Sequence, residues 1–555
     1  MSDDPTTFID VVEPPSEVEI AATTVATGSG RATGATLALA RAGFIVTFAF
    51  LISRVLGYVR YVAIAAAVPD PHQLDAFFAA FRIPDFLFQL VAAGALSSAL
   101  IPVVAGLLAT QEEARAWRVV SSVTTLMLST LAVLAAVVLL LAPGLVATIT
   151  PGFDESELAL TTELTRIMVL APLFLAAGAV ATSALNARGR FGAASVAPIA
   201  YNVGIIGGAI LLVPPFGVAG LAMGVVAGAA AHLLVQVPTL RRIGARIRPR
   251  VDLSDPQARR ALILMAPRAL GLGMTQVVFL VMTSLASTLP TGSISVFNFA
   301  FAILQIPIGV IGVPLGVVLL PSLSREAATG GMEAFRRLLV RGLSMLAWVM
   351  IAITALGIAL SGDIVQLLFG FVGVGESALD RTAATLAIFL IGLTAHSLIA
   401  VLARAFYALQ DTATPVVAAL IAVGVNIVVA SALVGPLGLN GLAVAIATAA
   451  WLETLALVLL LQRRMPSLGL GHVGSVMART ALVSIAGGVV AWAIVQGLSS
   501  AWGTEPGFLR LLLEMTLATV AGGLVIFAGS VALRIEEPRL IVGVVVDLMR
   551  RRGRS

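Results

Sequence analysis

The sequence predicts an all-α integral membrane protein with about fourteen transmembrane helices. These helices form two pseudo-symmetric six-helix lobes around a central cavity, followed by two C-terminal helices. Hydrophobic residues make up 59% of the 555 positions and charged residues 11%, and the mean hydropathy is +1.04, outside the soluble range. Apolar stretches long enough to cross a bilayer recur along the chain, and arginine-rich and acid-rich loops alternate between them.

The two ends of the chain are polar. Residues 1–38 carry six acidic side chains among many Thr, Ala and Gly and show little apolar periodicity, so we expect a disordered cytoplasmic tail. Residues 534–555 carry six arginines, which predicts a basic cytoplasmic tail.

Charge clusters and Pro/Gly positions divide the rest of the chain into spans. The predicted spans are 40–68, 76–107, 119–147, 160–186, 192–213, 216–239, 260–288, 293–322, 337–361, 381–409, 413–434, 440–462, 475–498 and 508–533. The first six belong to an N-terminal lobe, 39–240, and the next six to a second lobe, 241–462, while 463–533 holds the last two. Several spans exceed about 20 residues, which indicates tilt or breaks at Gly57, Pro84 or Pro307.

Loop charges orient the chain in the membrane. Arginines concentrate in the loops near 115, 188, 241–260, 325–341 and 463, whereas acids concentrate near 70–75, 154–157, 363–380 and 505. By the positive-inside rule both termini are cytoplasmic, which requires an even number of spans. Fourteen spans satisfy that requirement.

Short motifs repeat along the chain. Ile101-Pro102 recurs as Leu320-Pro321, Asn202 recurs as Asn426, and Arg41 recurs as Arg268, at offsets of 219, 224 and 227 residues. These offsets equal about six spans, so the two lobes are related by an axis along the membrane normal and suit alternating access around a central cavity. The alternative is chance similarity among helices rich in Ala, Leu and Gly.

Two arginines lie inside the first span, at Arg54 and Arg60. A charge at the bilayer centre costs about 2.5–3.5 kcal/mol on insertion scales, so such arginines usually face a polar cavity or a partner. The alternative is that both side chains extend to one interface. That alternative suits Arg54 less well, because about twelve largely apolar residues precede it.

The second span contains a polar stripe. Asp75, Arg82 and Gln89 are spaced by seven and share one helical face, and Asp85 lies three residues from Arg82 and can pair with it. The alternative is a stripe that only joins helices. Within the first two spans, however, Arg54, Arg60 and Arg82 outnumber Asp75 and Asp85, and an anionic ligand such as a phosphate would balance the excess positive charge.

Uncharged polar residues mark the second lobe. In span eight, Asn298 and Gln305 share a face with Ala302, where they are expected to line the cavity or to bond neighbouring helices. Asn426 and Thr448 are weak candidates for a sodium site, because they offer no carboxylate.

Several classes of function have no sequence support. The chain has no Cys and four scattered His, and it lacks a nucleophile–base pair, HExxH or a phosphate-cradling Gly loop. We therefore expect no metal centre, organic cofactor or enzymatic activity. The net charge of +5 follows from the loop arginines and does not require a nucleic-acid partner.

Four motifs carry a family resemblance: Ser53-Arg54-Val55-Leu56-Gly57 with Arg60; Asp75-Ala76-Phe77-Phe78 before Phe81-Arg82-Ile83-Pro84; Leu320-Pro321-Ser322-Leu323-Ser324; and Phe406-Tyr407 before Gln410-Asp411 and Thr414-Pro415. With them, the chain from about 40 to 530 resembles the MurJ (MviN) family, the lipid II flippases of the multidrug/oligosaccharidyl-lipid/polysaccharide exporter superfamily. The resemblance implies fourteen helices, a V-shaped cavity, and movement of an undecaprenyl-diphosphate-linked peptidoglycan precursor to the outer leaflet of a bacterial cytoplasmic membrane. It places Arg54, Arg60, Asp75 and Arg82 in or around the cavity.

The chain also departs from the family pattern. Two cavity arginines typical of the family fall at Phe88 and Ala302 here, and the acid that often follows the arginine matching Arg60 is Tyr61. The carboxylates that suggest a sodium site in some members have no counterpart in spans seven and eleven. Coupling to the membrane potential or to a monovalent cation is therefore left open, and we expect a monomeric transporter.

Two alternatives to lipid II transport remain. One is export of another polyprenyl-linked polysaccharide intermediate or of an amphipathic compound; cationic cargo would require acids in the cavity, where this chain has arginines. The other is a non-transporting scaffold whose basic tail binds anionic lipid or a partner.

Overall fold

The computed structural model describes residues 34–91, 95–252, 254–465, 468–502 and 507–538, and within them it contains helices and no strand. The helices are α2 (Gly34–Ala67), α3 (Pro71–Val91), α4 (Ala95–Ala109), α5 (Glu113–Ile149), α6 (Glu155–Met168), α7 (Ala171–Ala187), α8 (Phe191–Gly207), η1 (Gly208–Leu212), α9 (Val213–Phe216), α10 (Val218–Leu234), α11 (Val237–Arg242), α12 (Pro256–Ser287), α13 (Ser293–Pro307), η2 (Ile308–Gly312), α14 (Val313–Ala328), α15 (Met332–Ala359), α16 (Ser361–Phe369), α17 (Glu376–Ile391), α18 (Leu393–Ala408), α19 (Ala413–Leu437), α20 (Leu439–Arg464), α21 (Leu470–Trp502) and α22 (Phe508–Ala532).

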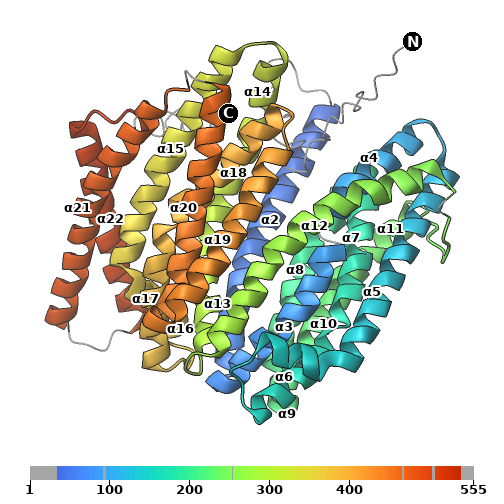
Figure 1. Ribbon diagram of the computed structural model, residues 1–555, viewed down its shortest axis with the longest axis horizontal. Coiled ribbons are helices and arrows are strands. Elements are labelled where there is room, and N and C mark those ends of the chain that lie inside the picture. The colour runs from blue at the N-terminus through green and yellow to red at the C-terminus, as the bar shows by residue number, and fades with distance from the viewer. Residues whose placement is uncertain (1–33, 92–94, 253, 466–467, 503–506, 539–555) are drawn as a thin grey trace.

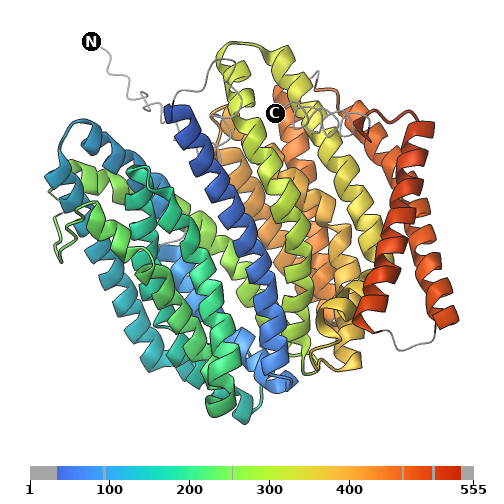
Figure 2. The same cartoon turned by 180° about the vertical axis from the view of Figure 1, so that it is seen from behind.

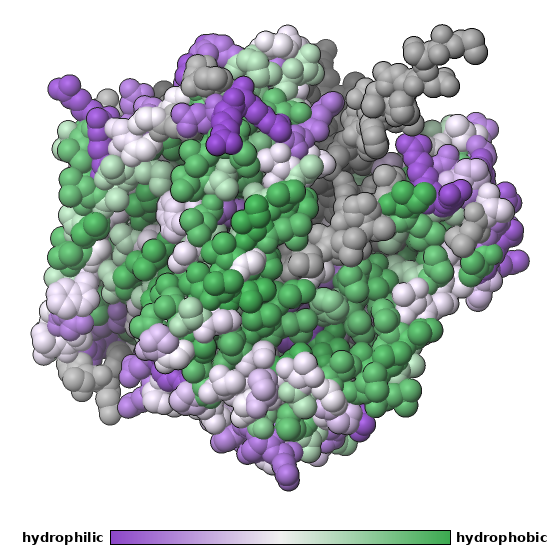
Figure 3. Space-filling view, in the orientation of Figure 1, coloured by the Kyte–Doolittle hydropathy of each residue, from purple (hydrophilic) through white to green (hydrophobic). Residues whose placement is uncertain are grey.

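Most predicted spans correspond to helices long enough to cross a bilayer. Among the described residues eleven helices meet that length and hydropathy requirement, or twelve if α17 and α18, bent by 41°, count as one span. The predicted span 76–107 falls on α3 and α4, between which 92–94 lie outside the described residues, and 260–288 falls on α12. Figure 3 shows the apolar surface as a broad band with polar residues gathered at its two ends. The count of fourteen remains a prediction.

Some sequence expectations concern the ends of elements. Helix α2 begins at Gly34, so residues 34–38, expected in a disordered tail, are helical. The remainder of that tail, the basic tail from 539 onward, and the side chains of Arg41 and Arg268 lie outside the described residues. Helices α2 and α3 continue through Gly57 and Pro84, whereas Pro307 is followed by the π-helical turn η2, one of the means by which a helix accommodates lost hydrogen bonds.

The internal repeat has a local structural counterpart. Gly217 and Gly438 both adopt positive φ, +60° and +55°, at the turns that join α9 to α10 and α19 to α20. Three residues later, Gly220 and Gly441 each pass so close to a carbonyl of the preceding helix that a Cβ would lie 2.1 and 2.3 Å from its oxygen. Both pairs are offset by 221 residues, within the predicted range, which supports the repeat.

The helices form two groups with α2 and α12 between them (Figures 1 and 2). Helices α3–α11 form one group, α13–α20 form the other, and α21 and α22 pack on α15 at the outer edge. Helix α12 packs against α3, α4 and α5 of the first group and against α19 of the second. The two groups separate toward the end at which α2 begins and α22 ends, and they converge at the opposite end.

Glycines allow α8 and α10 to approach at backbone distance. A Cβ at Gly204 would lie 2.2 Å from the Cα of Gly228, and a Cβ at Gly208 would lie 2.4 Å from the Cα of Gly224. Small residues at four-residue spacing permit this close packing, which is a major source of helix association in membranes. The contact holds α8, one wall of the cavity described below, against α10.

We predict that Gly204→Ala destabilises the protein by about 1–3 kcal/mol, because its methyl group would overlap the α10 backbone. Gly207→Ala is the matched control, since no atom lies within 4 Å of a Cβ at that position of the same helix. Thermal unfolding in detergent should show a lower midpoint only for Gly204→Ala. Equal midpoints for the two variants would contradict the proposed close approach.

Candidate functional site

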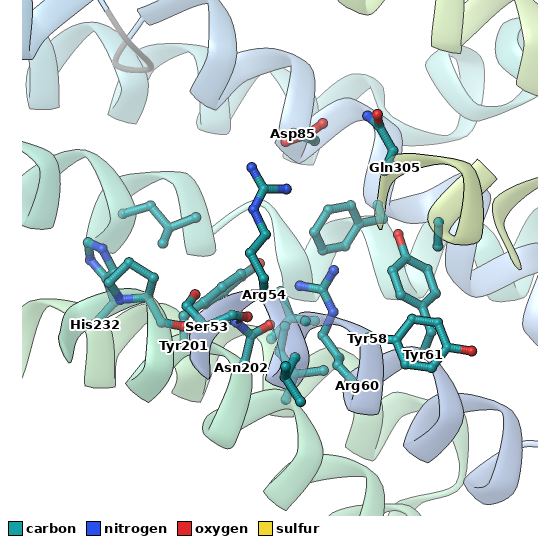
Figure 4. A pocket seen from close by; sticks show the side chains of 18 of the residues that line it. Ser53, Arg54, Tyr58, Arg60, Tyr61, Asp85, Tyr201, Asn202, His232 and Gln305 are labelled. Atoms are coloured by element: carbon teal, nitrogen blue, oxygen red, sulfur yellow. Dashed lines mark hydrogen bonds between the residues drawn. The ribbon is translucent and has the colours of Figure 1, made fainter. Parts of the chain in front are cut away.

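A cavity of about 1040 Å³ lies between the two groups of helices. Its walls come from α2, α3, α7, α8 and α10 on one side and from α13 with η2 on the other. Five predicted binding residues line it: Arg54, Arg60, Arg82, Asn298 and Gln305. Figure 4 shows Arg54 and Arg60 extending from α2 into this space, with Asp85 and Gln305 on the facing walls.

Arg54 reaches from α2 toward the second group of helices. Its guanidinium lies 5.1 Å from the centre of the Phe50 ring, a cation–π distance. A Cβ at Gly309 in η2 would lie 3.1 Å from the Arg54 Cζ, so the absence of a side chain there makes room for the guanidinium. No carboxylate among the described residues forms an ion pair with Arg54.

Arg60 lies nearly two turns further along α2. Its guanidinium lies 5.1 Å from the Tyr61 ring centre, and it too forms no ion pair with a carboxylate of the described part of the chain. The Asp85 carboxylate is near enough to both Arg60 and Arg82 to interact electrostatically with them. Arg54, Arg60 and Arg82 against Asp85 leave two positive charges among the described lining residues.

Arg82 connects the two groups of helices. Its Nε donates to Thr283 Oγ1 of α12 at 3.0 Å, and its Nη2 donates to Asn298 Oδ1 of α13 at 2.6 Å. The guanidinium also lies 5.2 Å from the Phe279 ring centre. Because these contacts use part of its donor set, Arg82 is less available to a ligand than Arg54 or Arg60 in this conformation.

Asp75 and Gln89, expected among the binding residues, do not line the cavity. The Asp75 carboxylate is 3% exposed and accepts the N–H groups of Gly292 and Ser295, both at 2.7 Å. It thereby caps α13, whose first N–H groups have no partner within the helix. Gln89 instead hydrogen-bonds the Asp85 carboxylate. The three residues share one face of α3, but successive members lie about 10 Å apart along its axis, so they meet different neighbours.

Aromatic rings pack across the two groups beside this cap. Tyr61 of α2 stacks on Phe78 of α3 at 6.1 Å between ring centres, and both contact Phe299 of α13 edge to face, at 6.5 and 5.7 Å. Phe299 in turn stacks on Phe369 of α16 at 4.6 Å. These four residues form an aromatic seal, which together with the Asp75 cap holds the two groups of helices together at one end of the cavity.

The two positions at which the resemblance implies arginines, Phe88 and Ala302, also face the cavity. Both Phe88 and Ala302 line it, and Ala302 lies between Asn298 and Gln305 as its spacing predicted.

Asn426 and Thr448 do not line the cavity; the Oδ1 of Asn426 is buried and has no hydrogen-bond partner. The described residues contain no group of three His, Asp or Glu side chains able to hold a metal ion.

Sequence reasoning missed a neutral polar part of the cavity. Thr182 of α7, Ser195, Tyr201 and Asn202 of α8, and His232 of α10 all line it. Figure 4 places His232 at the end of the cavity opposite Tyr61, with Arg54 and Arg60 between them. The sequence marks this region only by Tyr201-Asn202 and by a single His in otherwise apolar spans. The repeat that includes Asn202 does not indicate which surface this residue faces.

We predict that Asp75→Ala lowers the thermal midpoint of the purified protein, because it leaves two buried N–H groups of α13 without acceptors, at about 1–3 kcal/mol each. Asp75→Asn should lose less, since it keeps one acceptor oxygen. Asp380→Ala is the control, because that carboxylate is exposed and forms no hydrogen bond or ion pair among the described residues. A midpoint for Asp75→Ala that matches the control would show that the cap contributes nothing.

Comparison with known proteins agrees with this architecture. A family model described as lipid II flippase MurJ matches residues 64–512. A probable lipid II flippase MurJ of Rhizobium tropici is 31% identical over 511 residues, covering 90% of this chain and 93% of the relative. A lipid II flippase MurJ of Burkholderia cenocepacia is 32% identical over 426 residues, covering 75% of this chain and 82% of the relative.

Solved structures share the fold at low identity. A lipid II flippase MurJ in an inward closed conformation superposes with a TM-score of 0.72 at 21% identity, covering 88% of this chain and 99% of that chain. An inward-facing multidrug transporter of the MATE family, from the MOP superfamily, superposes with a TM-score of 0.62 at 16% identity, covering 75% and 95%. The predicted all-α transporter fold is thereby confirmed. Because the family model covers most of its length, the chain belongs to the lipid II flippase MurJ family.

Proposed function

We propose that this chain moves lipid II, a peptidoglycan precursor carried on undecaprenyl diphosphate, from the inner to the outer leaflet of a bacterial cytoplasmic membrane. The observation that carries the proposal is the pair Arg54 and Arg60, which enter the cavity without a carboxylate partner among the described residues. A diphosphate supplies the negative charge that would balance the two excess positive charges of the described lining residues. Family membership supports the same substrate.

The arginines suit a diphosphate for a geometric reason. A guanidinium donates two parallel hydrogen bonds to phosphate oxygens, and each charge-assisted bond is worth about 1.5–3 kcal/mol. Arg54 and Arg60 rest on aromatic faces, which leaves their N–H edges available to a ligand. With Phe88 and Ala302 in place of arginines, we infer that these two side chains carry most of the phosphate binding.

Transport by alternating access requires the closed end of the cavity to open. In this conformation that end is held by the Asp75 cap, the aromatic seal and the bonds from Arg82 to Thr283 and Asn298. A substrate can shift the equilibrium only if it binds the two conformations differently. We propose that phosphate competes with Thr283 and Asn298 for Arg82 and so weakens one of these contacts.

The same proposal includes orientation, assembly and energy source. We propose that both termini are cytoplasmic, that the transporter acts as a monomer, and that no organic cofactor takes part. The loop charges support the orientation. Coupling to the membrane potential or to a monovalent cation stays a prediction, and Asn426 and Thr448 are the residues to test for a sodium site.

We predict that Arg54→Ala and Arg60→Ala fail to complement a strain depleted of its own lipid II flippase, because each removes a phosphate ligand. Arg→Lys at either position should rescue only in part, since Lys keeps the charge and loses the paired donors. Arg118→Ala is the matched control, an exposed arginine without an ion pair in the described structure.

Membrane levels of each variant should be measured alongside complementation by quantitative immunoblotting. Loss of complementation at parental levels supports the assignment. Full activity of both alanine variants at parental levels would place the phosphate site elsewhere.

For topology, single cysteines can be introduced into this Cys-free chain. We predict that cysteines replacing Glu155 and Glu376 react with a membrane-impermeant maleimide in intact cells, whereas one replacing Ala245 reacts only after lysis. The reason is that 155 and 376 lie in acid-rich loops and 245 lies in an arginine-rich loop. Labelling of Ala245→Cys from outside would reverse the proposed orientation.

A further inference from the structure

The segment between α11 and α12, residues 245–252, has neither helix nor strand structure, bends at Pro249 and is held against α5. The N–H groups of Arg248, Arg250 and Asp252 donate to Ser121 Oγ at 3.1 Å, Thr125 Oγ1 at 3.0 Å and Ser122 Oγ at 3.2 Å. The Ser121 hydroxyl also donates to the carbonyl of Arg246 at 3.3 Å. Alternate residues from 246 to 252 therefore bond to one helix, which fixes the segment on both sides of the bend.

The segment carries basic and apolar side chains together. Arg246 and Arg248 flank Ile247 before the bend, and Arg250 and Val251 follow it. All five are exposed, including Ile247 at 40% and Val251 at 56%. The positive-inside rule accounts for arginines in this loop, but it does not account for exposed apolar side chains among them on a segment that three hydroxyl groups fix to a helix.

The acids near the segment are already paired. Asp252 bonds Arg250 at 2.9 Å, and Asp255 bonds Arg115 at 2.9 Å while it caps α12 through the N–H of Gln257. The Arg115 guanidinium holds the pKa of Asp255 below its usual range, so this carboxylate is ionised and engaged. The arginines around them that form no ion pair within the described chain are Arg241, Arg242, Arg246, Arg248, Arg259 and Arg260.

The segment lies where lipid headgroups are expected. Helix α5 has 37 residues, about 56 Å at 1.5 Å per residue, whereas the hydrocarbon core is about 30 Å thick. The segment bonds to Ser121, Ser122 and Thr125, which precede the apolar run 131–147 of the same helix. Figure 1 draws it as a coil at the outer edge of the molecule beside α11, and Figure 3 shows polar surface bordering the apolar band there.

We propose that residues 245–252 bind the headgroup of an anionic phospholipid in the cytoplasmic leaflet. Arg246 and Arg248 contact the phosphate, and Ile247 and Val251 contact the acyl chains below it. A lipid fits better than a soluble acidic partner because it supplies negative charge and apolar surface at the same depth. The assignment to the cytoplasmic leaflet rests on the orientation proposed above, whereas the site itself does not depend on the transported substrate.

The test compares lipid binding to the full-length purified protein by native mass spectrometry. Phosphatidylglycerol and phosphatidylcholine are titrated against the parent, against Arg246→Gln/Arg248→Gln, and against Arg325→Gln/Arg341→Gln. The last pair is a matched control with two exposed arginines that form no ion pair in the described structure and lie on the other lobe. We expect the first double variant to lose about ten-fold or more in phosphatidylglycerol affinity and the control to retain the parental preference.

Two further arms identify the ligand. Ile247→Ser should weaken phosphatidylglycerol binding without removing charge, and inorganic phosphate at the same concentration should fail to displace the lipid. Equal losses in the two double variants would attribute binding to net charge alone and overturn the site. Displacement by inorganic phosphate, or unchanged affinity in Arg246→Gln/Arg248→Gln, would overturn it as well. Parental thermal midpoints in each variant establish that folding is retained.

Discussion

Positive charge without a partner inside an apolar protein is the constraint on which this structure depends. Arg54 and Arg60 project into a space between two lobes, and within the described residues only Asp85 offers a nearby carboxylate. Such charges are tolerable in a membrane only where they face a cavity, so the cavity and the arginines require one another. The aromatic rings beneath both guanidinium groups hold them without neutralising them, which keeps the site attractive to an anion.

The closed end of the cavity is held by contacts that can be broken reversibly. One carboxylate caps one helix, four aromatic rings pack across the lobes, and one arginine bonds a hydroxyl and an amide. None of these is a buried ion pair between the lobes, whose separation would leave two unpaired charges. Breaking the Asp75 cap leaves a carboxylate and N–H groups near the end of the membrane span, where water can replace the lost bonds.

Within each lobe, by contrast, some helices approach one another at backbone distance. Gly204 of α8 and Gly208 of η1 bring the backbone of this continuous helical stretch onto α10, and the positive-φ glycines Gly217 and Gly438 end equivalent helices in the two halves. A lobe built in this way can move as a unit, because helices in backbone contact have no room for side chains to repack. Helix α12 packs against α3 and α4 of one lobe and against α19 of the other, so it is one of the helices that join them.

The sequence by itself determined the fold class, the approximate spans and the placement of arginines in the cavity wall. It could do so because helices that cross a bilayer must be long and apolar, so a charged residue within such a helix is easily recognised from one sequence. Asp75 was misplaced for the opposite reason. Its partners, Gly292 and Ser295, are 217 and 220 residues away, and Arg82 meets Asn298 across 216 residues. Helical spacing shows which residues share a face; only the tertiary structure decides what that face meets, because cap acceptors and cavity walls are created when distant helices pack together.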